Sequence, residues 1–287
     1  MAKLAPFSQI DSINTRSKCR AGYYRPLLNI ARTLPSAAGG NRPYSDAMQL
    51  LKLTLPSPAE NLALDEALIE SAERTEDHPE VLRLWEPAEN FVVIGRSSSF
   101  SGEVNHDYCT ENNIPVFRRV TGGASIVTGP GCLMYGVLLD YRRRPELRML
   151  DQAHQFVMNK MADAVRSLGI ETEVEGICDL TINHRKVSGN SLRCKRNWMF
   201  YHGTMICDFD RSLIGKCLDW PKRTPDYRKD RPHDDFVGSI PTTTRKLGDA
   251  IRRQWGTDAM LGQWPQEETA RLAAEKYASK NWSEKVG

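Results

Sequence analysis

A short segment of the chain combines two arginines with a pair of glycines. Arg118 and Arg119 precede Gly122 and Gly123 within the run 117–127, FRRVTGGASIV. Glycine lets backbone N–H groups approach a ligand closely, and guanidinium groups supply fixed positive charge. The segment therefore indicates a site for a phosphate or a carboxylate. An ordinary hairpin turn with surface arginines is the alternative, because short glycine motifs also occur by chance.

Lys186 is a second candidate for chemistry. It lies between a predicted turn at 183–185 and the small residues Ser188 and Gly189, so we expect it to point inward from a strand over a floor of small residues. A positively charged loop and a lysine are together what the activation of a carboxylate by ATP requires. The attacking carboxylate and the α-phosphate are both anionic, so fixed cations must offset their repulsion.

His202 begins the triplet His-Gly-Thr, which we expect to close the next hairpin. A core histidine bonded to the backbone is favoured over a catalytic one. The neighbouring Trp198, Phe200 and Tyr201 are expected to pack in the core, with the lining of an acyl tunnel as the alternative.

The hydrophobic pattern predicts the elements that position these residues. The predicted strands are 49–55, 81–85, 91–95, two strands on either side of the glycine turn within 117–127, then 132–139, 172–174, 178–182, 186–191 and 198–207. The predicted helices are 62–70, 107–113, 148–168, 247–255 and 267–277. Residues 221–241 are rich in proline and charge and are predicted to form a loop. Strands and helices are mixed without strict βαβ alternation, which predicts an α+β fold.

The composition excludes several classes of protein. The 287 residues carry a net charge of +3, but residues 1–45 hold seven Lys or Arg against one Asp, so the remainder is slightly acidic. A basic nucleic-acid binder is therefore not expected. No apolar run approaches the roughly 20 residues that span a bilayer, so no membrane partner is expected either. The seven cysteines form no C-x-x-C pair, which predicts no metal site and a reduced, cytoplasmic protein.

The N-terminal part of the chain differs in composition from the rest. Residues 1–47 lack sustained periodicity and contain PSAAGGNRP, so we expect them to be disordered. Their Arg- and Ser-rich, acid-poor character is similar to an organellar transit peptide. A mis-annotated extension, with Met48 as the true start, is the alternative. Residues 48–287 are expected to form one catalytic domain.

Three motifs, in this order, resemble the family of lipoate–protein ligases and lipoyl or octanoyl transferases, which is related in fold to biotin–protein ligases. The matching residues are RRVTGG at 118–123, the segment 179–191 (DLTINHRKVSGNS), and HGT at 202–204 followed by Asp208. The resemblance extends over about residues 48–285 and includes the predicted helix that begins at Asn61. It implies a mixed β-sheet domain of the biotin/lipoate protein ligase type, flanked by helices.

The resemblance also implies a reaction. Lipoate or octanoate would attack ATP, supplied with Mg²⁺, and the acyl-adenylate would then acylate a lysine of a carrier domain. The carrier would be the lipoyl domain of a 2-oxoacid dehydrogenase E2 or the glycine cleavage H protein, and no tightly bound cofactor is implied.

The implied catalytic residues are Lys186, on the acyl carbonyl and α-phosphate, and Asp179, as a partner of the lysine or of a metal. Arg119 would hold the nucleotide together with the backbone of 124–127, Arg118 would line the anion-binding loop, and the glycines would keep the pocket open. The residues given substrate or nucleotide contacts are Arg118, Arg119, Gly122, Gly123, Ala124, Ser125, Ile126, Val127, Lys186, Ser188 and Gly189.

The chain also departs from the pattern of the ligases. Ala124 replaces a third glycine, Thr128-Gly129 replaces a His-Asp pair, and Gly131-Cys132 replaces Gly-Asn, so the nucleotide contacts of this loop are less firmly implied. The C-terminal accessory domain of long ligases is expected to be absent, in which case a separate chain would supply it. Two alternatives follow: a transferase that works without ATP, and a degenerate member that binds ligand without turnover. If a transferase used a cysteine thioester, Cys178 would be the first thiol to test.

Overall fold

The computed structural model describes residues 48–221 and 224–285, and the segment 1–47 lies outside the described residues. Within them, an eight-stranded mixed sheet has the order β11-β1-β2-β6-β10-β9-β8-β7. Its strands are β1 (Gln49–Lys52), β2 (Val81–Trp85), β6 (Cys132–Asp140), β7 (Glu173–Glu175), β8 (Asp179–Ile182), β9 (Arg185–Cys194), β10 (Trp198–Ile206) and β11 (Ala259–Met260). Strand β1 is parallel to β2 and β11, and the other neighbours are antiparallel.

A separate three-stranded sheet carries the glycine segment. Strand β3 (Phe91–Ile94) lies between β4 (Val116–Arg118) and β5 (Ile126–Thr128), parallel to the first and antiparallel to the second. The strands that flank the glycine turn are therefore not hydrogen-bonded to each other, and the hairpin alternative is wrong. The glycine segment instead crosses the end of β3.

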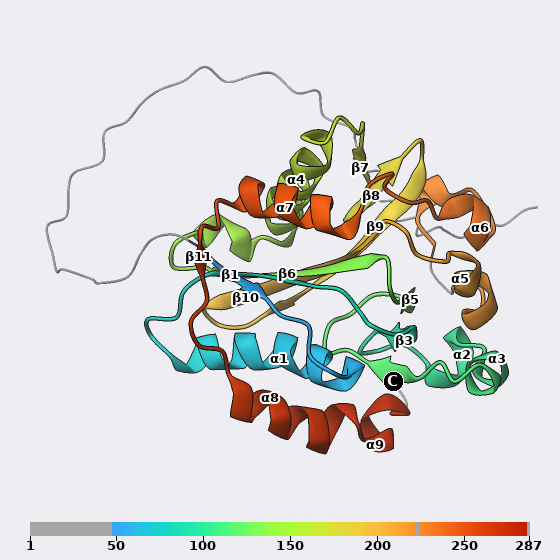
Figure 1. Ribbon diagram of the computed structural model, residues 1–287, viewed down its shortest axis with the longest axis horizontal. Helices are drawn as coiled ribbons and strands as arrows, with labels where there is room; N and C mark the ends of the chain where they lie inside the picture. The colour runs from blue at the N-terminus through green and yellow to red at the C-terminus, as the bar shows by residue number, and fades with distance from the viewer. Residues whose placement is uncertain (1–47, 222–223, 286–287) are drawn as a thin grey trace, which may run out of the picture. The chain divides into compact units, whose positions relative to one another are not determined.

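Helices cover both faces of the large sheet (Figure 1). On one face lie α4 (Leu150–Arg166) and α7 (Thr244–Trp255), and on the other lies α1 (Pro58–Arg74), backed by α8 (Gln266–Leu272). The remaining helices are short: α2 (Phe100–Glu103), α3 (His106–Glu111), α5 (Ser212–Cys217), α6 (His233–Phe236), α9 (Lys280–Ser283), the 3₁₀ helices η1 (Pro145–Arg148) and η2 (Asp226–Arg228), and the π-helix η3 (Ala273–Tyr277). This α+β architecture, with mixed sheets flanked by helices, is the fold class that the sequence predicts.

The alternation of side chains along β10 divides the interior into two cores. Met199, Tyr201 and Met205 pack in the core beneath α4 and α7. Trp198 and Phe200 point the other way and pack against α1, because successive side chains of a strand face opposite sides. The sheet is therefore apolar on both faces, and the predicted packing role of the aromatic cluster is confirmed.

Local sequence signals explain where the main helices begin and end. Ser57 and Glu60 form a capping box at the start of α1. Helix α7 begins after Thr243, which accepts a hydrogen bond from Lys246 N, and ends at Gly256 in the left-handed conformation, with φ of 65°.

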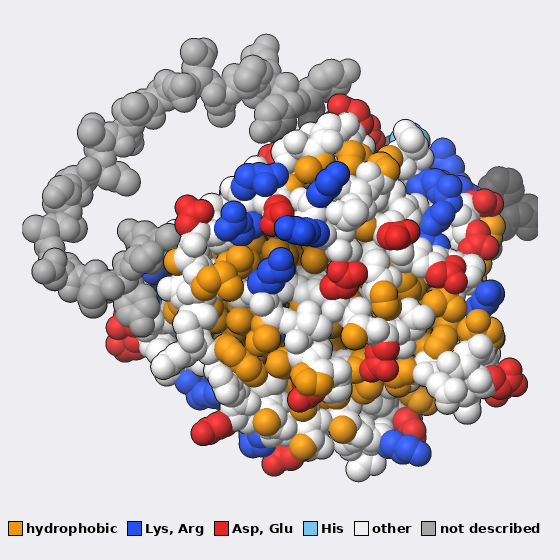
Figure 2. All heavy atoms as spheres, in the orientation of Figure 1, with side chains coloured by type: hydrophobic (Ala, Val, Ile, Leu, Met, Phe, Trp, Pro, Cys, Tyr) orange, Lys and Arg blue, Asp and Glu red, His pale blue; other side chains and the backbone are white. Residues whose placement is uncertain are grey.

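Helix α7 is amphipathic. Its apolar residues, Leu247, Ala250, Ile251 and Trp255, are buried in the core. Its basic residues, Arg245, Lys246, Arg252 and Arg253, are exposed, and basic side chains gather over this helix in the space-filling view (Figure 2). Within the described residues, no helix is both long and apolar enough to cross a membrane.

Three local expectations are wrong. His202 to Thr204 do not close a hairpin but lie inside β10, opposite Gly136 to Met134 of β6. The segment 221–241 contains η2 and α6, because its prolines stand before these short helices rather than inside them. Met149, which the helical pattern of 148–168 places on the buried face, caps α4 and is 61% exposed.

Candidate active site

Two adjoining cavities meet at Lys186. The first, of about 110 Å³, is lined by Arg119, His202 and the small residues of β9 and the glycine segment, and we call it the His202 cavity. The second, of about 140 Å³, is lined by apolar side chains and by Arg228, and we call it the Arg228 cavity. Both are lined by Ala124, Ser125, Ile126, Lys186, Gly189 and Thr204. The expected site residues of β5, β9 and the glycine segment therefore come together around one lysine.

The turn between β8 and β9 places Lys186 at this junction. Asn183 and His184 have φ of 51° and 57°, the left-handed pair that a two-residue hairpin turn requires. A Cβ at Gly189 would lie 3.1 Å from Lys186 Cε, so the side chain of the lysine lies directly over the glycine. The predicted floor of small residues is confirmed.

Lys186 is held by a carboxylate that also holds another segment. Its Nζ lies 2.8 Å from Asp179 Oδ1, and the Tyr227 hydroxyl donates to Asp179 Oδ2 at 2.7 Å. Burial, and then the negative charge of Asp179, raises the pKa of Tyr227, which therefore remains a donor. Asp179 lines neither cavity, and its carboxylate contacts Lys186 and Tyr227.

Arg119 shapes the glycine segment from within. It is buried, and its guanidinium donates to Thr121 Oγ1 at 3.0 Å and to the carbonyls of Gly122 and Ala124. Desolvation lowers its pKa to about 10, which leaves it cationic at neutral pH. Arg119 lines the His202 cavity while fixing the path of the loop.

The glycine segment approaches β3 too closely for side chains. A Cβ on Gly95 would lie 1.9 Å from the carbonyl oxygen of Gly123, and Gly123 itself has φ of 91°. Glycine is the residue suited to both positions. Gly122 faces a different groove, between Arg96 and Arg193, so it does not line the two cavities.

Arg118 does not line the anion-binding loop, which corrects the expectation for this residue. Its side chain is fully buried and donates six hydrogen bonds to backbone carbonyls. Three acceptors lie in 95–98 and three in 282–285, and the Trp282 indole donates back to the Arg118 carbonyl at 2.7 Å. The N–H groups of the guanidinium are all directed at backbone carbonyls, because β4 places this side chain beside residues 282–285. Arg118 is a structural cross-link.

His202 belongs to a chain of polar side chains that the sequence did not reveal. Its Nδ1 lies 3.4 Å from Asp65 Oδ2, and its Nε2 lies 2.7 Å from Thr121 Oγ1. Asp65 also pairs with the fully buried Arg83. His202 is therefore tied to side chains rather than to the backbone. The only sequence signal is the position of Asp65 within the predicted helix 62–70.

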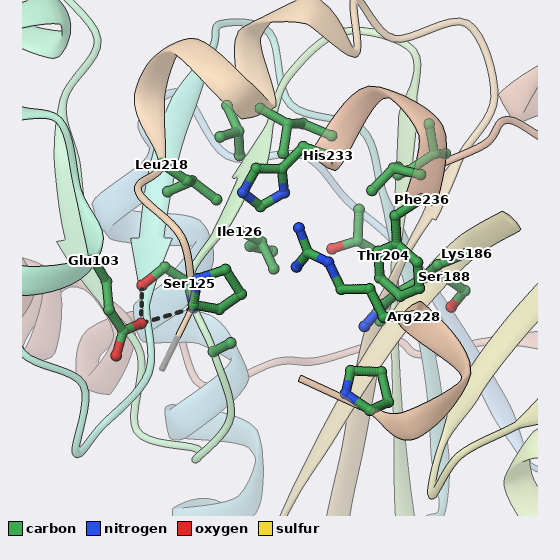
Figure 3. A pocket seen from close by; sticks show the side chains of 18 of the residues that line it. Glu103, Ser125, Ile126, Lys186, Ser188, Thr204, Leu218, Arg228, His233 and Phe236 are labelled. Carbon is green, nitrogen blue, oxygen red and sulfur yellow. Dashed lines mark hydrogen bonds between the residues drawn. The ribbon is translucent and has the colours of Figure 1, made fainter. Parts of the chain in front are cut away.

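The segment after β10 forms the outer wall of the Arg228 cavity. Leu218, His233 and Phe236 face the interior, and Arg228 extends into the cavity from η2 in the direction of Ile126 and His233 (Figure 3). On the opposite wall, Ser125 donates through N and Oγ to Glu103 Oε2, at 3.2 and 2.7 Å. The sequence analysis did not identify the wall that contains Arg228, His233 and Phe236, because residues 221–241 were predicted to form a loop.

Cys178, the thiol that the sequence singles out, is not an activated nucleophile. The six cysteines among the described residues are free. Cys178 lies beside Asp179, but burial, and then the charge of Asp179, raises its pKa to about 11. A thiol with so high a pKa is protonated at neutral pH and is a weak nucleophile.

The described residues contain one group spaced for a metal ion, namely Glu173, Glu175 and His184. None of the three lines either cavity. Glu173 and Glu175 lie in β7 and His184 lies in the turn between β8 and β9, so the group is separate from the candidate site.

A known family accounts for this arrangement. The model of the lipoyl protein ligase A/B catalytic domain matches residues 57–253. The chain belongs to this family. Lipoate–protein ligase 1 of Staphylococcus aureus is 26% identical over 169 residues, which cover 57% of this chain and 47% of the ligase. Octanoyltransferase LipM of Clostridioides difficile is 25% identical over 192 residues, covering 60% of this chain and 69% of the transferase.

Solved structures show the same lipoate ligase fold. A bi-partite lipoate protein ligase from Thermoplasma acidophilum superposes with a TM-score of 0.71 at 19% identity, covering 84% of this chain and 97% of that one. A lipoate–protein ligase A bound with ATP gives a TM-score of 0.70 at 18% identity, covering 84% and 100%. The chain spans about half the length of the curated ligases that it matches.

Proposed function

We propose that this lipoyl protein ligase family member joins lipoate or octanoate to a lysine of a carrier domain through an acyl-adenylate. The observation that carries the proposal is the position of Lys186 at the junction of two cavities, one beside buried Arg119 and the other beside buried Arg228. Two anionic reactants must meet in adenylate formation, and a cation at their meeting point lowers the cost. An ammonium between two pockets is suited to this task.

The chemistry would proceed in two steps. An oxygen of the acyl carboxylate attacks the α-phosphorus of ATP, and pyrophosphate leaves with the bonding electrons. The amine of the carrier lysine then attacks the acyl carbonyl, AMP leaves, and a proton is lost from nitrogen. Lys186 would hold the carboxylate and the α-phosphate together in the first step and offset the charge on AMP in the second. Magnesium would arrive with ATP as part of the substrate.

The remaining site residues have supporting roles in this proposal. Arg119 and Gly123 would fix the loop, the backbone of 124–127 would contact the nucleotide, and Gly189 would leave room above β9. Ser188 lines the Arg228 cavity and bonds Asn190 through its hydroxyl at 3.2 Å. Asp179 would hold the lysine until substrate binds.

Known proteins support both the nucleotide and the partner. One structural neighbour is named as a ligase bound with ATP, and another was analysed with its E2 lipoyl domain. We therefore propose the lipoyl domain of a 2-oxoacid dehydrogenase E2 as acceptor, with the glycine cleavage H protein as a second acceptor. Because the Thermoplasma ligase is bi-partite, we also propose that a separate accessory chain assists activation. The predicted cytoplasmic location remains an expectation.

A transferase that works without ATP is the second candidate. It is favoured by the similarity to LipM. The match covers 69% of that transferase but only 47% of the ligase from S. aureus. The raised pKa of Cys178 argues against a thioester relay through that thiol. A degenerate member that binds ligand without turnover is the third.

One assay separates these candidates. The full chain is incubated with lipoate, Mg-ATP and an apo lipoyl domain, and pyrophosphate release is followed beside acyl transfer from an octanoyl carrier. Lipoate-dependent pyrophosphate release supports the ligase. Acyl transfer without ATP contradicts it and supports the transferase. If neither reaction occurs, with or without a candidate accessory chain, while lipoate still binds, the third candidate is supported.

A further inference from the structure

Arg228 combines deep burial with an unsatisfied charge. The residue is 3% exposed, and its Nη2 is buried without a hydrogen-bond partner among the described residues. Its Nε donates to the Arg231 carbonyl at 2.9 Å, which fixes the direction of the guanidinium. The group lines the Arg228 cavity, into which it points (Figure 3). A buried charged donor without a partner is costly, so its presence indicates a missing acceptor.

Acidic residues lie near Arg228: the charge of Asp230 acts on it, and Asp219 lines the same cavity. Within the described residues, none of the ion pairs includes Arg228. Asp179 is occupied by Lys186 and Tyr227, and Glu103 accepts from Ser125. Arg231 adds a further positive charge beside Arg228. Arg228 therefore has an acidic neighbour in Asp230, but its Nη2 has no hydrogen-bond partner among the described residues.

The surroundings of Arg228 fit one class of ligand. The guanidinium carbon lies 4.2 Å from the Trp220 ring centroid and 4.9 Å from that of Phe236, which holds the charge in place by cation–π contact. The other walls include Ile126, Leu218 and the His233 ring. Apolar and ring-bearing walls around a fixed guanidinium fork match a planar base joined to a phosphate.

We propose that Arg228 binds a phosphate of the nucleotide, and then of the acyl-adenylate, opposite Lys186. This inference rests on the proposed ligase function and adds a residue from the segment after β10 to the nucleotide site. Lys186 reaches the Arg228 cavity from β9 and Arg228 reaches it from η2, so the phosphate would lie between two cations from different segments. The Tyr227 bond to Asp179 ties η2 to β8 and so sets the position of Arg228.

A purely structural Arg228 would behave differently. In that case the stacking against Trp220 and Phe236 would be its whole role, and its removal would weaken the fold without discriminating between ligands with and without phosphate. A phosphate contact instead predicts that removing Arg228 weakens the binding of AMP and ATP but not the binding of adenosine. The comparison of adenosine with AMP and ATP distinguishes the two.

The test measures binding of adenosine, AMP and Mg-ATP to the full chain by calorimetry. Arg228→Met is expected to weaken AMP and ATP by roughly 10- to 100-fold, the effect of one charge-assisted contact, and to leave adenosine unchanged. Arg228→Lys is expected to restore part of the affinity, because it keeps the charge but not the fork. Lys229→Met, a charge removal on an exposed residue of the same turn, is the matched control and should change nothing.

Each other outcome counts against the proposal. If Arg228→Met binds AMP as the wild type does, or loses adenosine equally, the phosphate contact is wrong while the ligase function stands. If the wild type binds adenosine as tightly as AMP, the contact is refuted without any variant, including the case in which Arg228→Met does not fold. If the wild type binds neither AMP nor ATP, both the contact and the ligase function fail.

Discussion

Lys186 Nζ lies 2.8 Å from Asp179 Oδ1, across the hairpin of β8 and β9. The lysine is thus held before substrate arrives, and its side chain remains partly exposed at 29%. A cation so held needs little reorganisation to meet an incoming anion, which is the condition for electrostatic catalysis.

We expect Lys186→Ala to lower kcat for acyl-adenylate formation by about 100-fold or more, because the reacting carboxylate and phosphate lose their shared cation. The melting temperature should change little, since the side chain is not part of a core. Pyrophosphate release and thermal unfolding measure the two effects, and Lys246→Ala on the exposed side of α7 is the control. Near-full turnover by Lys186→Ala would refute the mechanism.

Tyr227→Phe should loosen the attachment of η2 to β8. The lost hydrogen bond to a carboxylate has a net value of about 1.5–3 kcal/mol, which is the expected decrease in the free energy of unfolding. We also expect KM for ATP to rise more than kcat falls, because the lysine itself is untouched. A urea titration and steady-state kinetics provide the readouts. Equal changes in KM for ATP and in kcat would contradict a link between Tyr227 and the wall of the Arg228 cavity.

Alkylation of Cys178 should depend steeply on pH. Burial raises the pKa of this thiol to about 11, and only the thiolate reacts, so its rate should rise about tenfold per pH unit from pH 7 to 10. Iodoacetamide labelling followed by peptide mass spectrometry checks this, with the exposed Cys194 in the same sample as a reference for access. Fast labelling at pH 7 would revive the thioester route, which Cys178→Ser would then test by loss of transfer.

Arg118→Met should destabilise the protein rather than act on catalysis directly. Six carbonyls lose their donor, and at 1–3 kcal/mol for each unsatisfied buried group the loss is at least about 3 kcal/mol even after relaxation. Urea unfolding measures this loss. Arg271→Met, which breaks exposed ion pairs to Glu268 and Glu275, should change the free energy of unfolding far less, because solvent screens exposed ion pairs. Comparable values for both variants would contradict the structural assignment.

Gly95→Ala should distort the glycine segment, because the added Cβ would meet the Gly123 carbonyl at 1.9 Å. We expect lower affinity for lipoate together with a lower melting temperature. Gly262→Ala is a suitable control, since a Cβ there meets no atom within 4 Å. Unchanged lipoate binding by Gly95→Ala would show that the loop tolerates displacement.

Local patterns predicted those parts of the fold that depend on neighbouring residues. The apolar run 198–207 became β10, and the turn before Lys186 formed where the sequence predicts it, because strand periodicity and turn chemistry act over a few residues. The periodic helix at 148–168 was found within two residues at each end. These features could therefore be predicted from local sequence patterns alone.

Partners distant in the sequence could not be predicted in this way. Nothing near Arg118 indicates that its acceptors lie in 282–285, and a cation next to Arg119 resembles a ligand contact until those carbonyls are placed. Strand pairing has the same limit, since the pattern of 117–127 does not reveal that β3 separates β4 from β5. Arg228 was missed because a proline-rich segment gives no signal of which cavity it will cover.

The guanidinium of Arg118 also orders events in time. Its acceptors at Trp282 and Ser283 are made 164 and 165 residues after it, so a ribosome has translated the whole family domain before this cross-link can close. Until then the strand that leads into the glycine segment holds a buried charge with only half of its acceptors. We therefore expect the nascent chain to acquire ligand affinity only after residues 282–285 have left the exit tunnel.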